Sequence, residues 1–306
     1  MNDLAVLFLQ HGLERLLPHM PTLARPSIRL RETEEVGRAG YSRLGGLPDA
    51  YPDFRWPRFR DCQLSAQQAE TLDLDTPLIF LGQLNWQQLK PFDTANALPT
   101  SGGALFFTGL GLGAGTYFVA NLDEFAPRHF PLPEHLKYVL PRRLLYPQFE
   151  WTLPYYGFHG TIGGGDARKC FFDTLSPGIE FLVLSDAESK AYEQLRANLG
   201  QAGSSRHRVL GHPDYEQNPM RLDLECQTRG LVLNYKTYLE LYDPQAPLTR
   251  QLKQQALDSK WRLAFQVGHF STDEGLWGDG GTHYFWSKQE DLYSPVPRFI
   301  GSGQCG

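Results

Sequence analysis

The polar residues best suited to chemistry lie in a glycine-rich stretch near the C-terminus. Asp279 and His283 are four residues apart, which on a strand places both side chains on one face, and Trp277 precedes them. A carboxylate and an imidazole could act as an acid–base or metal-binding pair, with His212 or His269 as a third group. The structural alternative is an Asx turn, in which Asp279 accepts backbone N–H groups. We favour the turn, because the intervening glycines disrupt regular strand pairing.

Uncharged amides form a second group of candidates. Glutamine and asparagine are poor acid–base groups, but they suit ligand recognition or the satisfaction of backbone groups. We therefore predict a binding site and no catalytic residue. The residues assigned to it are Gln83, Asn85, His212, Gln217, Gln266, Trp277, Asp279 and His283.

Two glycine-rich loops, residues 109–115 and 160–166, superficially resemble phosphate-binding loops. A dinucleotide loop follows a strand and opens a helix, whereas the first of these runs into the strand-like sequence 116–119. The second could cradle an anion, but a surface loop is the simpler interpretation. The sequence also has no nucleophile elbow, no H-E-x-x-H and no C-x-x-C pair, so we expect no metal and no cofactor.

Composition narrows the class of protein further. The 306 residues are 41% hydrophobic and 21% charged, as in an ordinary globular protein, and the net charge is −5. Nucleic-acid binding draws on an excess of Lys and Arg, which is missing here. No run approaches the roughly 20 apolar residues that span a bilayer, and the N-terminus has no basic leader. We expect a cytoplasmic protein that binds neither nucleic acid nor membrane.

The elements that would position the candidates are mostly short strands. Abundant aromatics, Gly and Pro favour a half-buried pleated sheet with many turns. Apolar spacing predicts a helix over 3–17, closed by Pro18, and another over 187–199. Strands are predicted from Ile28 and over the segments 77–85, 102–107, 179–184 and 263–267, with a short helix over 86–89.

The second half of the chain repeats signals of the first half in the same order. A glycine is followed by Pro-Asp in two turns, an apolar strand carries Gln twice, and a glycine pair precedes an aromatic strand twice. The paired segments are 44–49 with 210–214, 79–84 with 263–267, and 102–107 with 280–285. We therefore predict an α+β fold of mainly antiparallel sheets, with internal duplication and a few peripheral helices.

These motifs carry a family resemblance. Residues 42–48 with Trp56-Pro57 resemble the S-K-[IL]-G-G-x-P…W-P opening of YwqG-like bacterial proteins. Residues 80–85 are similar to the family's F-L-[AG]-Q-[IL]-N strand, and 277–285 to its W-G-D-x-G-x-x-[YF]-F block. The segment 210–217 resembles its L-G-[YH]-P…Q segment, while Arg43 stands where the family usually has Lys. The resemblance implies a duplicated α+β fold of unknown function, and it hints at toxin immunity.

We accordingly predict a single YwqG-like unit over residues 1–306. The first pseudo-repeat is 27–125, a connecting elaboration with a strand and a helix is 126–205, and the second pseudo-repeat is 206–300. The predicted function is a non-enzymatic binding module that uses the cleft between its repeats to hold a protein partner or small ligand, and toxin immunity is the specific form of this role that the resemblance suggests. The alternative is a hydrolase or metal-dependent enzyme that uses the Asp/His cluster.

Overall fold

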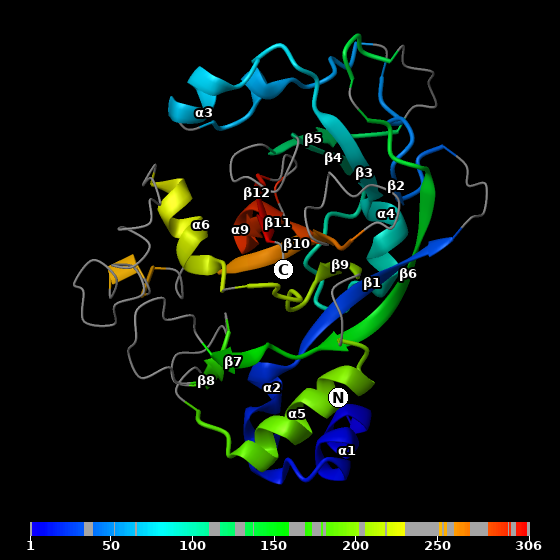
Figure 1. Ribbon diagram of the computed structural model, residues 1–306. Helices are drawn as coiled ribbons and strands as arrows, with labels where there is room; N and C mark the ends of the chain where they lie inside the picture. Colours follow the sequence, from blue (N-terminus) through cyan, green and yellow to red (C-terminus); the bar gives the residue numbers. More distant parts are fainter. Residues whose placement is uncertain are drawn as a thin grey trace. The chain divides into compact units, whose positions relative to one another are not determined.

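The computed structural model contains one large antiparallel sheet with helices at its margins (Figure 1). By contacts the chain divides into two compact units. Unit 1 comprises 1–27, 150–203 and 211–261, and unit 2 comprises 28–149, 204–210 and 262–306. The residues that the structure describes are 2–33, 39–51, 53–64, 66–109, 117–125, 132–136, 138–158, 169–172, 179, 182–201, 206–217, 219–229, 251–252, 254–255, 260–269, 281–292, 294 and 298–304.

Unit 2 is organised around ten strands in the order β12-β11-β10-β9-β1-β6-β2-β3-β4-β5. Two runs of sequential antiparallel neighbours therefore flank a central pair, β1 and β6. The strand bounds are β1 Arg25–Thr33, β2 Arg43–Leu44, β3 Ile79–Asn85, β4 Gly103–Thr108, β5 Tyr117–Leu122, β6 Arg143–Thr152, β9 His207–Leu210, β10 Trp261–Val267, β11 Thr282–Lys288 and β12 Ile300–Gln304.

The two end strands of this sheet approach one another, so the sheet is nearly closed. A Cβ atom on Gly301 of β12 would lie 2.2 Å from Cγ of Tyr117 in β5, which shows that glycine is needed for the approach. The ring of Phe106 in β4 lies 4.9 Å from that of Phe265 in β10 and 4.7 Å from that of Phe285 in β11. The interior between the two runs is therefore filled by packed aromatic rings.

Short helical segments border the sheet of unit 2. The strand β3 runs directly into α4, because Oδ1 of Asn85 accepts the backbone N–H of Gln88 and caps the first turn. The helical segments of this unit are η2 Phe59–Asp61, α3 Ala66–Thr71, α4 Trp86–Leu89, η3 Lys90–Phe92 and α9 Gln289–Leu292.

Unit 1 is a helical layer with a small hairpin. The first and longest helices pack on a common core with Phe8 and Tyr192, both fully buried, and lie together beside the N-terminus in Figure 1. Its elements are α1 Asn2–Gln10, η1 Glu14–His19, α2 Met20–Leu23, β7 Tyr156–Phe158, β8 Lys169–Phe171, α5 Asp186–Asn198 and α6 Arg221–Thr228. No helix within the described ranges is long and apolar enough to cross a membrane.

Most predicted elements are present, and two predictions are wrong. The strand over 79–85, the helix over 86–89 and the helix of α5 match their predictions closely. Pro18 does not close the first helix: Gly12 ends it with φ +66°, and Pro18 lies inside the following 3-10 turn. The segment 182–184 is not a strand, because Leu182 instead donates its N–H to Ile179 in a turn.

Candidate functional site

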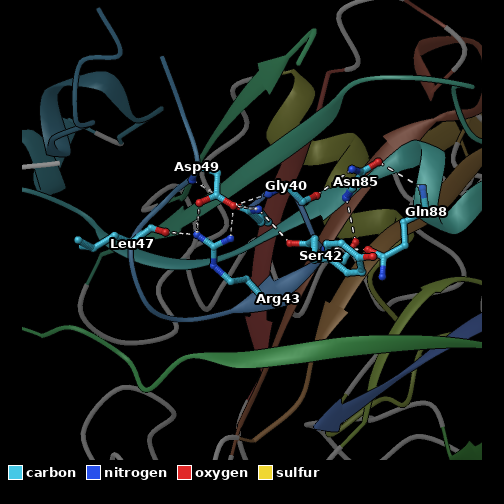
Figure 2. A network of polar contacts seen from close by, with 9 residues as sticks. Gly40, Ser42, Arg43, Leu47, Asp49, Asn85 and Gln88 are labelled. Carbon is cyan, nitrogen blue, oxygen red and sulfur yellow. Dashed lines mark hydrogen bonds and ion pairs between the residues drawn. The ribbon is translucent and has the colours of Figure 1, made fainter. Parts of the chain in front are cut away.

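A polar network in unit 2 is centred on a buried ion pair between Arg43 and Asp49 (Figure 2). Nη1 of Arg43 donates to Oδ2 of Asp49, and Nη2 donates to Oδ1 at 3.0 Å and to the carbonyl of Leu47. The side chains of Arg43 and Asp49 are only 3% and 12% exposed. The fork-shaped guanidinium therefore ties the start of the glycine loop to its end.

Gln83, one of the predicted binding residues, belongs to this network. Its Nε2 donates to Oδ2 of Asp49 and to the carbonyl of Tyr41, both at 2.9 Å, while its Oε1 accepts the backbone N–H of Asp49 at 3.1 Å. The amide lies opposite Arg43 in the β2–β3 register. Three of its hydrogen-bonding positions are thus filled by the protein itself, which matches backbone satisfaction rather than ligand recognition.

Asn85 is also brought into the network. Its Nδ2 donates to the carbonyl of Gly40 at 2.8 Å, and its backbone N–H donates to Oγ of Ser42 at 2.9 Å, as Figure 2 shows. The backbone N–H of Gly40 in turn donates to Asp49 at 2.7 Å. Asn85 therefore caps α4 and anchors the chain before β2 at once.

Electrostatics in the network favour a charged Asp49. Burial alone would raise the pKa of this carboxyl. The hydrogen bond and charge of Arg43, together with the hydrogen bonds of Gly40 and Gln83, lower it by more than burial raises it, so the pKa lies below its ordinary value. A carboxylate held ionised and saturated by four donors has little capacity left to act as a general base.

The loop that this network encloses requires glycine. Gly45 and Gly46 have φ values of +56° and +69°, and a Cβ on Gly45 would lie 2.2 Å from the carbonyl oxygen of Pro141. The backbone N–H of Gly46 donates to the carbonyl of Leu140. The glycine pair therefore allows a tight turn directly after β2, and this turn packs closely against the backbone of residues 140–141 before β6.

The second run of strands repeats this local geometry. Gln266 lies opposite Arg208 in the β9–β10 register, and its Nε2 donates to the carbonyl of Arg206 at 2.9 Å. In the first run Gln83 lies opposite Arg43 and donates to the carbonyl two residues before it. Positive φ values follow at Leu210 (+63°) and Gly211 (+75°), at the places corresponding to the glycine pair.

A further pair of bonds matches in the same register. The backbone N–H of Asn85, two residues after Gln83, donates to the side chain of Ser42; that of Gly268, two residues after Gln266, donates to Nδ1 of His207 at 3.2 Å. The hydrogen bonds beside residues 43–49 and beside residues 208–214 are thus alike at these positions.

His283 is fully buried and paired with a tyrosine. Its Nδ1 lies 2.9 Å from the hydroxyl oxygen of Tyr117 in β5. Burial lowers the pKa of the imidazole to about 3, so it is neutral at physiological pH. The same burial raises the pKa of Tyr117. This contact joins the end strand β5 to β11, the strand next to the other end of the sheet, and such a histidine cannot become cationic there without cost.

His212 lies in unit 1, and it is also fully buried. Its Nε2 donates to the carbonyl of Leu23 at 2.8 Å, and its backbone N–H donates to Oγ1 of Thr152 at 2.9 Å. Burial and the positive charge of Arg25 hold its pKa well below the usual value. The imidazole is therefore a neutral group that joins two backbone segments.

Two of the remaining predicted residues lie within the described part of the chain. Gln217 is exposed and His269 is half-buried, while Trp277 and Asp279 lie outside the described residues. Among the described residues, no three His, Cys, Asp or Glu side chains are grouped to hold a metal ion. Trp86 is buried, and Trp56 donates its Nε1–H to the carbonyl of Leu78.

Several notable residues were not predicted as site residues from the sequence. Arg43 and Asp49 belong there only to a turn motif, although their spacing of six residues across a glycine pair lets the two side chains meet. Tyr41 and Tyr146 are 43% and 60% exposed. The β2–β6 register pairs Arg43 with Leu144, and the backbone N–H of Leu145 donates to the carbonyl of Ser42 beside Tyr41.

Comparisons with known proteins give one finding. A family model described as a domain of unknown function (DUF1963) matches residues 42–295. This range begins at Ser42 in the polar network and ends beyond β11. Among curated proteins none matches the chain. The more specific resemblance to YwqG-like proteins stays a prediction.

Proposed function

The chain belongs to the DUF1963 family, and we propose that it is a non-enzymatic binding module that captures a protein partner. The observation that carries the proposal is the exposure of two tyrosines of unit 2, Tyr41 just before β2 and Tyr146 in β6, because β2 and β6 are paired strands. Tyrosine supplies a large contact area and a polar tip at low entropic cost, and it is enriched at binding hot spots.

The chemistry of the expected partner follows from the surroundings of this tyrosine pair. Arg31 of β1 and Arg142 just before β6 are exposed, and both strands belong to the same unit as the pair. A complementary protein surface would be apolar at its centre and acidic at its rim. The more specific form of the proposal, toxin immunity, is supported by the family resemblance of the sequence motifs.

The location of the surface differs from the predicted cleft between the repeats. Within unit 2, the described side chains between the two runs of strands are packed aromatic core, among them Phe106, Phe265 and Phe285. We propose that the partner binds outside this core, where the elaboration enters the sheet at β6.

Internal duplication is part of the proposal. It is supported by the matched pairs Arg43–Gln83 and Arg208–Gln266, the equivalent hydrogen bonds of the two glutamines, and the paired positive φ values that follow. We call each arginine with the glutamine opposite it an arginine–glutamine clasp. Each glutamine bonds the backbone two residues before its own arginine, which explains why similar motifs recur without forming one common site.

The alternative of a hydrolase or metal enzyme receives less support from the described residues. Its His283 and His212 are both buried, neutral and hydrogen-bonded to the fold. We also place the protein in the cytoplasm. In support, Cys62 and Cys226 are free thiols, and burial raises their pKa to about 12 and about 11.

Site-specific photo-crosslinking tests the proposal. A photoreactive phenylalanine analogue replaces Tyr146, and the matched control carries it in place of Val6, an exposed apolar residue of unit 1. The proposal predicts a discrete protein adduct at position 146 that excess wild-type chain competes away and Tyr41→Ala chain does not. The same adducts at both positions, or none at 146, would refute it.

A further inference from the structure

One buried arginine of unit 1 forms no ion pair with a carboxylate of the described residues. Arg196, on the inner face of α5, is only 7% exposed, and its Cζ lies 5.2 Å from the centroid of the Tyr155 ring. Within the described part of the chain, Nε of Arg196 has no hydrogen-bond acceptor, and no carboxylate forms an ion pair with the guanidinium. A guanidinium carries five N–H donors and stays charged, so burying it without an acceptor is costly.

The enclosed charges of unit 1 are of both signs. Among its described residues the buried arginines are Arg25, Arg196 and Arg221, and the buried carboxylates are Asp214 and Glu225. Glu150 is half-buried, and its Oε1 accepts the hydroxyl of Ser27 at 3.3 Å. His212 adds no charge to this interior, because burial and the charge of Arg25 hold its pKa well below the usual value.

The ring under Arg196 is held in place before any ligand arrives. Both ends of the Gln201 amide bond the backbone of Leu153, at 2.7 and 2.9 Å, and the hydroxyl of Tyr192 donates to the carbonyl of Pro154 at 2.9 Å. A Cβ at Gly157 would lie 2.2 Å from Cε1 of Tyr155, so glycine makes room for the ring. The residues flanking Tyr155 are thus fixed on both sides.

We propose that Arg196 and Tyr155 form a binding site for one oxyanion, a carboxylate or a phosphate group of a small ligand. The guanidinium offers paired N–H donors that match such a group in a bidentate geometry. The ring covers the guanidinium face and contributes a cation–π contact, which strengthens in a dehydrated setting. This site lies in unit 1 and does not depend on the tyrosine pair proposed for partner binding.

The test is thermal unfolding of the full chain in sodium phosphate, sodium acetate and sodium chloride at matched ionic strength. A ligand that binds the folded state alone raises the Tm in a saturable way. We expect saturable stabilisation by phosphate or by acetate beyond chloride, and the effective salt identifies the oxyanion. Equal Tm values in all three salts would overturn the proposal.

Two variants assign the effect to the site. Arg196→Met should weaken the anion response at least about tenfold, whereas Arg229→Met, which removes an equal charge from an exposed position of unit 1, should leave it unchanged. In chloride, Arg196→Met should unfold at or above the wild-type Tm, because it removes a buried charge that forms no ion pair with a described carboxylate. A lower Tm, or a failure to fold, would show a structural arginine and overturn the proposal, as would equal anion responses in the two variants.

Discussion

Replacing Asp49 with alanine should leave the guanidinium of Arg43 buried without its carboxylate. The two side chains are 3% and 12% exposed. Removing one partner of a buried ion pair costs about 3–5 kcal/mol, and we expect about 3 kcal/mol because Asp49 keeps slight contact with water. The change also deprives the N–H of Gly40 and the amide of Gln83 of their acceptor. Against a total stability of about 5–15 kcal/mol, this loss is large.

Urea unfolding of wild type, Asp49→Ala and Asp53→Ala measures the effect. Asp53 is exposed in the same segment, so its removal should change the free energy of unfolding by less than about 0.5 kcal/mol. Arg43→Met combined with Asp49→Leu should recover part of the loss, because no charge is then left buried alone. The N–H of Gly40 and the amide of Gln83 still lack their acceptor in this variant. A cost below about 1 kcal/mol for Asp49→Ala would refute the structural role of the network.

The pH dependence of that difference has a definite sign. The folded-state pKa of Asp49 is lowered, because Arg43 and the other donors outweigh the effect of burial. A carboxyl of this kind contributes its full stability above its unfolded pKa of about 3.9 and loses it as the pH falls through the folded value. The difference between wild type and Asp49→Ala should therefore be constant near neutral pH and shrink in strong acid.

Three further predictions concern the fold. In urea unfolding, Gly45→Ala should lower the free energy of unfolding by about 1–3 kcal/mol more than Gly12→Ala does. Both glycines have positive φ, but only Gly45 has a backbone oxygen where the Cβ would lie. Equal costs would contradict this. Burial lowers the folded pKa of His283 to about 3, so wild-type stability should fall as the pH drops from about 6.5 to about 3. His283→Gln should flatten that part of the profile. An unchanged slope would count against a neutral imidazole. Ser185→Ala should cost about 1 kcal/mol by removing the capping box at α5, and a loss of helix signal on mild heating by circular dichroism would report it; an unchanged transition would argue otherwise.

The sequence predicted the strands better than the site. Alternation and apolar runs located β3 and β10, since burial on one or both faces of a sheet is written directly into the side chains. The recurrence of Gln83 and Gln266 also pointed to equivalent positions. The ring closure through Gly301 and Tyr117 could not be predicted, because it joins strands that are far apart in the chain.

The roles of the polar residues required the structure. Ligand binding by Gln83 and Asn85 stays a prediction. In the structure their amides donate to the carbonyls of Tyr41 and Gly40, and such backbone partners carry no sequence signal. Arg196 stands in an ordinary amphipathic helix, so nothing in its spacing indicated burial over Tyr155. A buried arginine and an exposed one look alike until their neighbours are known.

The most direct test of the central claim compares Tyr146→Ala with Gln266→Met in calorimetric binding to the partner captured by crosslinking. The claim is that exposed tyrosines bind the partner while the glutamine clasps hold the fold. Tyr146→Ala should weaken binding at least about tenfold and change stability by less than about 0.5 kcal/mol. Gln266→Met should lower the free energy of unfolding by about 1–3 kcal/mol and leave the affinity of the folded chain unchanged. The reverse pattern, with binding lost in Gln266→Met and kept in Tyr146→Ala, would contradict the account.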